Sequence, residues 1–256
     1  MLQAHSFVWH YLWVAPNLLL LVLGSLMWRR RLTLHFPNFL TFVLFSAAGH
    51  LALYAADVMP SVTAVNFWRT YWGSLLLDAI LKVTLMGEIF SHLSRSYPFV
   101  AKLGRSLIRG IAVVLFFAAV AAAAYAQQDN FHWLISGVHL FEQATYLVES
   151  GLLLSIFLFV AYFHLSWNHR AFGIALGLSI SACVHLATWA VMANARISVH
   201  QRTVLDFLNM ATYHICVLVW FYYLLIPQKS AAKSAVSLPE HDLDIWNREL
   251  ERLLQQ

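Results

Sequence analysis

Residues 171–193 read AFGIALGLSISACVHLATWAVMA, and His185 is the only acidic or basic side chain among them. A helix needs about 20 mainly apolar residues to cross the hydrocarbon core of a bilayer. A strand that crosses a membrane is only about 10 residues long and alternates apolar with polar residues, which this stretch does not do. The stretch therefore predicts a membrane-spanning helix.

Six further stretches have a similar length and apolar content. They are residues 8–28, 36–58, 66–92, 107–126, 132–163 and 203–226. Of the 256 residues, 61% are hydrophobic and 11% are charged, whereas soluble domains have about 45–50% apolar and roughly 25% charged residues. The sequence predicts an all-α fold, a polytopic transmembrane bundle of seven helices over residues 1–227. It excludes a water-soluble enzyme, a nucleic-acid-binding domain and a disordered chain.

The distribution of basic residues predicts the orientation of the bundle. One side of the predicted membrane carries twelve of them: Arg29, Arg30, Arg31, Arg95, Lys102, Arg105, Arg109, Arg170, Lys229, Lys233, Arg248 and Arg252. The other side carries only Arg69, Arg196 and Arg202. Because basic residues concentrate in cytoplasmic loops, the N-terminus is expected outside and the C-terminus in the cytoplasm. The formal charge of +4 therefore needs no nucleic acid to explain it.

Tryptophans near the ends of the spans predict a belt at the membrane interface. They are Trp9, Trp28, Trp68, Trp133, Trp167, Trp189 and Trp220.

The C-terminal tail predicts a second, smaller element. Residues 228–236 are mostly small or polar and are expected to form a linker. Ser237 and Glu240 have the spacing of a capping box, which begins a helix over residues 237–256. Leu243, Trp246, Leu250 and Leu253 form one apolar stripe on that helix. The sequence thus predicts a short amphipathic cytoplasmic helix, which lies on the bundle or membrane surface, or joins a second copy or a protein partner.

Ionisable side chains inside the spans are the candidates for function, because burying them in a membrane is costly unless they pair or face a cavity. Asp78 and Lys82 lie four residues apart on one helix face and predict an ion pair. His139, Glu142, Tyr146 and Glu149 recur on one face of residues 132–163. Histidines and carboxylates in three other spans fall at overlapping depths: His50, His185, Asp206 and His214.

These depths predict a polar pocket open to the outer side. Its predicted ligand-binding residues are Asp78, Lys82, His139, Glu142, His185 and His214. A carboxylate next to a histidine predicts a response to pH between about 5 and 8. The alternative is that these groups only hydrogen-bond neighbouring helices, at about 0.6 kcal/mol each.

The sequence leaves the function open among three classes. The first is a receptor-like or sensor-like protein of a bacterial inner membrane that binds a small ligand or ion, and no soluble catalytic domain is expected. The second is a redox protein that holds haem or a metal ion, with candidate ligands His50, His139, His185 and His214. The third is a transporter or an accessory subunit of a membrane complex. Retinal is excluded, because the last span has no lysine for a Schiff base.

Overall fold

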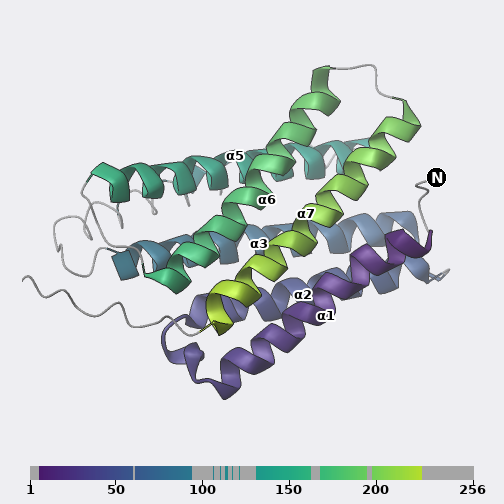
Figure 1. The fold of residues 1–256 in the computed structure, drawn as a ribbon. Helices are drawn as coiled ribbons and strands as arrows, with labels where there is room; N and C mark the ends of the chain where they lie inside the picture. Colours follow the sequence, from purple (N-terminus) through teal and green to yellow (C-terminus); the bar gives the residue numbers. More distant parts are fainter. Residues whose placement is uncertain are drawn as a thin grey trace, which may run out of the picture. The chain divides into compact units, whose positions relative to one another are not determined.

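The computed structural model describes residues 6–59, 61–93, 131–162, 168–194 and 198–226, with residues 106, 110, 113, 114, 117 and 121. Within these ranges the chain is helical and forms no strand. The elements, drawn in Figure 1, are α1 (Phe7–Arg29), the short 3₁₀-helix η1 (Leu32–Leu34), α2 (Pro37–Val58), α3 (Ala64–Leu93), α5 (Phe131–Tyr162), α6 (His169–Asn194) and α7 (Val199–Leu225).

The prediction of an all-helical fold is confirmed for the described residues. Six of the seven predicted spans coincide with a helix to within a few residues. The predicted span 107–126 lies outside the described residues except for a few isolated helical positions, and so do the linker 228–236 and the tail helix 237–256. The count of seven helices and the orientation of the bundle therefore stay predictions.

Five of the described helices are long and apolar enough to cross a membrane: α1, α2, α5, α6 and α7. Helix α3 is longer than any of these except α5, but it is not among the five, and it carries Asp78, Lys82 and Glu88. The outward faces of the helices are apolar. On α5, for example, Leu140, Leu147, Leu154 and Leu158 are all more than half exposed. Such stripes fit contact with lipid, since a water-soluble monomer rarely exposes large apolar patches.

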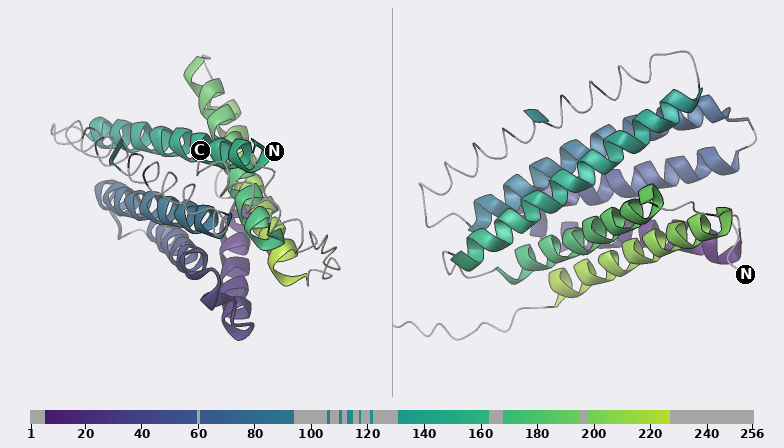
Figure 2. Two further views of the ribbon diagram at one scale, coloured as in Figure 1. Left: turned by 90° about the vertical axis from the view of Figure 1, so that its left-hand side faces the viewer. Right: turned by 90° about the horizontal axis from the view of Figure 1, so that it is seen from above.

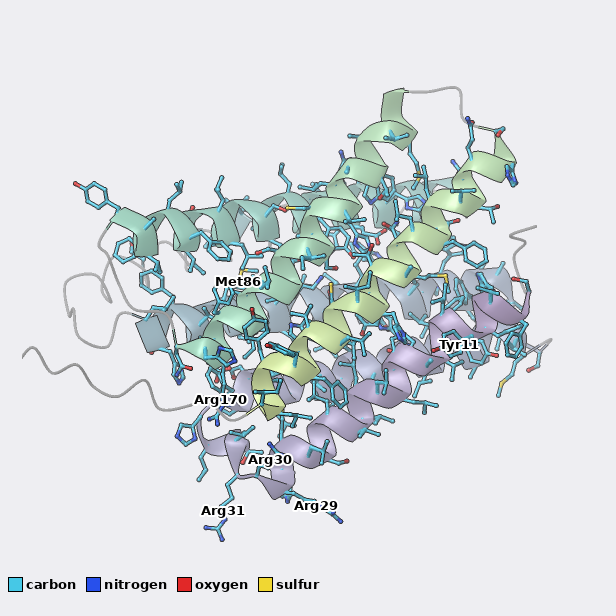
Figure 3. The ribbon with its side chains drawn as sticks, in the orientation of Figure 1. Tyr11, Arg29, Arg30, Arg31, Met86 and Arg170 are labelled. Atoms are coloured by element: carbon cyan, nitrogen blue, oxygen red, sulfur yellow. The ribbon has the colours of Figure 1, made fainter. Side chains whose placement is uncertain are left out.

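The six helices form a closed series of neighbours. Each of α1, α2, α3, α5, α6 and α7 packs against the next, and α7 returns to α1. The two views in Figure 2 show α5 alongside α3 and α7 alongside α1. Arg29, Arg30, Arg31 and Arg170 all lie at one end of these helices (Figure 3). We call this end the basic end of the bundle.

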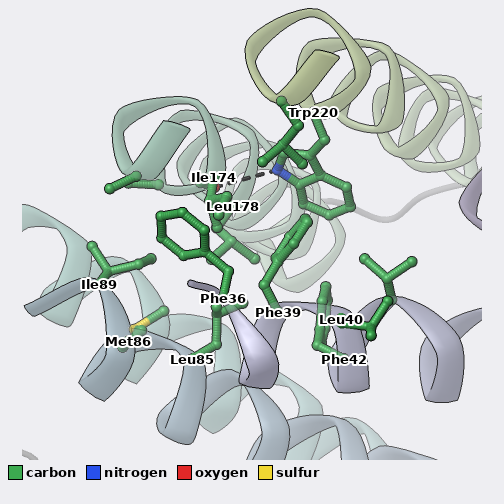
Figure 4. Packing of buried hydrophobic residues seen from close by; sticks show 14 of the residues in the cluster. Phe36, Phe39, Leu40, Phe42, Leu85, Met86, Ile89, Ile174, Leu178 and Trp220 are labelled. Carbon is green, nitrogen blue, oxygen red and sulfur yellow. Dashed lines mark hydrogen bonds between the residues drawn. The ribbon is translucent and has the colours of Figure 1, made fainter. Parts of the chain in front are cut away.

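A close-packed apolar core fills the half of the bundle next to the basic end. Figure 4 shows the packing of part of this core. Trp220 of α7 is 2% exposed, and its ring meets the rings of Phe39 and Phe42 edge-on at 5.4 and 6.0 Å. Its indole N–H donates a hydrogen bond to the carbonyl oxygen of Ile174 at 3.3 Å. The prediction that Trp220 belongs to the interfacial belt is therefore wrong, because its ring satisfies its N–H inside the bundle.

Two glycines let α7 lie directly on α6. A Cβ atom at Gly173 would overlap the ring of Tyr223, and one at Gly177 would overlap the ring of Trp220. Small residues four positions apart bring membrane helices close together in this way. This Gly-x-x-x-Gly spacing is visible in the sequence as the signal for that contact.

Side chains of other helices cap two helix ends near the basic end. Both carboxylate oxygens of Glu88 on α3 accept hydrogen bonds from the first free N–H groups of α2, those of Asn38 and Phe39, each at 3.1 Å. The guanidinium of Arg30 donates to the carbonyl oxygen of Leu225 at the end of α7, at 2.7 Å. Both contacts satisfy backbone groups that a helix end leaves unpaired. Glu88 is thus a structural residue.

We expect Glu88→Ala to lower the free energy of unfolding by about 1–2 kcal/mol, because two N–H groups of α2 lose their acceptor. Glu88→Gln keeps one oxygen acceptor and should lose about half as much. Reversible denaturation in mixed micelles measures both changes. Equal stability of the wild type and Glu88→Ala would show that Glu88 does not cap α2.

Candidate functional site

A cavity of about 900 Å³ lies in the half of the bundle opposite the basic end. All six helices contribute to its wall, for example through Trp13 of α1, His50 of α2, Asp78 of α3, Glu142 of α5, and His185 and Asn209 on α6 and α7. Trp220, which belongs to the apolar core, also lines the cavity at the side nearest the basic end. The bundle is therefore solid in one half and hollow in the other.

Five of the six predicted site residues line this cavity: Asp78, Lys82, His139, Glu142 and His185. His214 does not. Neighbouring side chains on a helix point about 100° apart, so Tyr213 faces the cavity while the ring of His214 lies 5.9 Å from that of Tyr11 on α1. The prediction that His214 belongs to the pocket therefore has no support in this geometry.

The deepest charged group of the cavity is an ion cluster that joins α3 to α5. The ammonium of Lys82 lies 3.0 Å from a carboxylate oxygen of Asp78, as the sequence predicts, and 3.1 Å from Oε2 of Glu149. It also lies 4.7 Å from the ring centre of Tyr146. Glu149 is 3% exposed, and its Oε1 has no hydrogen-bond partner among the described residues. Lys82 is thus held by two carboxylates and the face of an aromatic ring, a cation–π contact.

A third carboxylate, that of Glu142, lies two turns before Glu149 on α5. It accepts a hydrogen bond from the hydroxyl of Tyr71 at 3.3 Å, and Nδ1 of His139 is 3.8 Å away. The ring of His139 lies between two indoles, with centroid distances of 5.9 Å to Trp68 and 5.1 Å to Trp189. Glu142 therefore lies among aromatic rings and has no Lys or Arg partner among the described residues.

Hydrogen bonds between helices support the remaining wall. Nδ1 of His50 is 3.3 Å from Oδ1 of the buried Asn17, which connects α2 to α1. The hydroxyls of Ser46 and Tyr213 are 3.2 Å apart and connect α2 to α7. Thr188 donates to Oδ1 of Asn209 at 3.2 Å and connects α6 to α7. The interhelical hydrogen bonds expected as an alternative to a pocket thus coexist with the cavity.

His185 is held in a defined orientation by α5 and α6. Its ring is stacked on Tyr146, with centroids 4.3 Å apart, and its Nδ1 lies 2.8 Å from the carbonyl oxygen of Ser181. When Nδ1 carries the proton, it donates a hydrogen bond to that carbonyl oxygen. Nε2 is then free to accept a hydrogen bond or to bind a metal.

A side chamber of about 160 Å³ extends from the cavity between α2 and α3. It shares His50, Tyr71, Asp78 and Glu142 with the main cavity. Its remaining wall is mostly apolar and includes Phe45 and Leu77. The chamber therefore places apolar side chains of α2 and α3 next to the charged groups.

The described residues contain no group of three His, Cys, Asp or Glu side chains that could hold a metal ion. Of the four candidate metal ligands, His50, His139 and His185 line the cavity, whereas His214 lies outside it. Of the four candidates, only His50, His139 and His185 could therefore contact a metal ion or haem bound in the cavity.

Several cavity residues are not among the predicted ligands. Trp68 and Trp189 are predicted as interfacial residues. Glu149, which pairs with Lys82 behind the cavity wall, belongs to the predicted stripe on α5 but not to the predicted pocket. Tyr71 lies seven residues before Asp78 and eleven before Lys82, which places all three on one face of α3. That spacing is the signal that could have identified Tyr71. Asn17, in an otherwise apolar span, offers no comparable pattern.

Lys82 is expected to depend on its two carboxylates together. Lys82→Met leaves Asp78 and Glu149 without a cation and should lower the free energy of unfolding by about 3–5 kcal/mol. Asp78→Asn or Glu149→Gln alone leaves a one-to-one ion pair and should lose only about 1–2 kcal/mol. The double variant Asp78→Asn with Glu149→Gln removes both partners of Lys82. Its loss of unfolding free energy should therefore exceed the sum of the two single losses. Denaturation in mixed micelles measures these differences, and strictly additive losses would contradict a shared cluster.

No protein-family model, curated protein or solved structure matches this chain. The function is therefore inferred from the geometry of the cavity.

Proposed function

We propose that this chain is an integral membrane receptor or sensor that binds a small ligand or ion in the cavity from the outer side of a bacterial inner membrane. The observation that carries the proposal is that five of the six predicted binding residues, from three helices, line one cavity of about 900 Å³. Ligand pockets measure about 300–1,000 Å³ and combine apolar walls with a few polar groups. The size and the lining of this cavity support a binding site.

The position of the cavity supports access from one side. The walls contain residues near the starts of α1, α3 and α7, such as Trp9, Trp68 and Arg202, so the cavity extends towards the end with few basic residues. The other half is closed by the apolar core. With the basic end in the cytoplasm, the cavity opens outward. A conformational change would then reach a partner through the cytoplasmic tail helix 237–256.

Cysteine accessibility tests the site and its orientation without a known ligand. Two positions on α6 form a matched pair: Ser181 lines the cavity, and Ala175 is fully buried in the apolar core. In a background with Cys183 and Cys216 replaced by alanine, we expect a membrane-impermeant thiol reagent added outside intact cells to modify Ser181→Cys. Ala175→Cys should stay unmodified.

Two results would contradict the proposal. Modification of neither position would show that the cavity is closed to water. Modification of Ser181→Cys only from the cytoplasmic side, in inverted vesicles, would reverse the orientation.

One observation favours a second candidate, a haem-binding redox protein. His50 on α2 and His185 on α6 both line the cavity, and each is oriented through Nδ1, which leaves Nε2 directed elsewhere. Two imidazoles from facing helices are sufficient for bis-histidine ligation of haem. The charged groups Asp78, Lys82 and Glu142 in the same cavity favour a polar ligand instead.

An absorption spectrum of the purified protein separates the two candidates. We expect no Soret band, before or after incubation with haem. A Soret band that disappears in both His50→Ala and His185→Ala would establish the second candidate in place of the first.

A further inference from the structure

The cavity already contains one bound ammonium group, that of Lys82. Two carboxylates lie at 3.0 and 3.1 Å from its nitrogen, and the ring centre of Tyr146 lies at 4.7 Å. Carboxylate oxygens and aromatic faces are the two groups that proteins use to bind an ammonium ion away from water. The deeper part of the cavity is therefore built to hold an organic cation.

The same combination recurs around Glu142, one turn from Tyr146 on α5, without a lysine. The carboxylate lies next to Tyr71 and His139, and the indoles of Trp68 and Trp189 flank His139. All five side chains line the cavity. Compared with the surroundings of Lys82, this carboxylate has a histidine at 3.8 Å in place of a lysine.

The charged residues of the cavity also favour a bound cation. Four carboxylates lie in its wall or directly behind it, those of Asp78, Glu142, Glu149 and Asp206. Among the described residues only two Lys or Arg side chains do so, Lys82 and Arg202. Such an excess of negative charge attracts a cation.

An organic cation fits this site better than a metal ion. Calcium and magnesium ions need several oxygen ligands around one point, and the described residues contain no group of three His, Cys, Asp or Glu side chains that could hold a metal ion. The cavity is instead rich in aromatic rings, and its side chamber between Phe45 and Leu77 has a mostly apolar wall. A ligand with a charged nitrogen and an apolar group would fit both the carboxylates and aromatic rings of the cavity and the apolar wall of the side chamber.

We propose that the cavity binds a small organic amine in its protonated form. Its ammonium group lies against the carboxylate of Glu142, beside Tyr71 and Trp68, whose ring centres are 5.6 Å apart. Its apolar group extends towards the side chamber. This inference rests on the proposed function, since it names the ligand class of the same cavity. Lys82 stays paired with Asp78 and Glu149 and does not contact the amine.

Three probes of one shape and different charge test the inference: 2-phenylethylamine, 2-phenylethanol and 3-phenylpropanoate. Thermal unfolding of the full chain in lipid nanodiscs, titrated with each probe, gives an apparent affinity. We expect the amine to raise the melting temperature and the other two to leave it unchanged. Glu142→Gln should weaken binding of the amine on the order of tenfold or more, because it removes the charge-assisted contact. Trp68→Leu should weaken it severalfold, and Trp68→Phe less.

Glu88→Gln is the matched control, because it neutralises a carboxylate in the opposite half of the bundle. It should lower the melting temperature but leave the affinity for the amine unchanged. The inference is overturned by equal shifts with the amine and the alcohol, by a larger shift with the carboxylate, by no shift with any probe, or by amine binding that Glu142→Gln leaves intact. Labelling of Ser181→Cys does not depend on any probe, so it shows separately whether the cavity itself exists.

Discussion

A buried ammonium group is the constraint on which the interior of this bundle depends. Lys82 is 8% exposed, near the middle of α3. A positive charge there is unfavourable unless oxygen atoms replace the water that it has lost. Asp78 supplies one carboxylate from the same helix, and Glu149 supplies the other from α5. The pairing therefore sets how far α3 and α5 are displaced along each other, and it places their polar faces on a common cavity.

The two halves of the bundle have different physical roles. Near the basic end, the glycines of α6, the ring of Trp220 and the caps of α2 and α7 hold the helices in a dense apolar core. In the other half the side chains are polar or aromatic, and they leave a cavity among the same six helices. Apolar packing and satisfied interhelical hydrogen bonds both favour a single arrangement of helices.

Part of the candidate site could be predicted because helical periodicity decides which side chains share a face. The spacing of Asp78 and Lys82 predicts their contact, and the stripe from His139 to Glu149 predicts one face of α5. His214 shows the limit of such reasoning. Its depth resembles that of the true wall residues, but the rotation of α7 turns Tyr213 towards the cavity and His214 towards α1. Rotation of a helix about its axis depends on its neighbours, so depth alone could not decide it.

The sequence by itself determined that the chain is helical and embedded in a membrane, because the length and apolar content of a span are local properties. It also determined which polar residues lie within the spans. Only the tertiary structure decided that Glu149 is the second partner of Lys82, that Trp68 and Trp189 flank His139 beside Glu142, and that Trp220 is a core residue. Each of these facts joins residues of different helices. Such contacts depend on the rotation and displacement of whole helices, which packing at Gly173 and Gly177 and the pairing of buried charges set together.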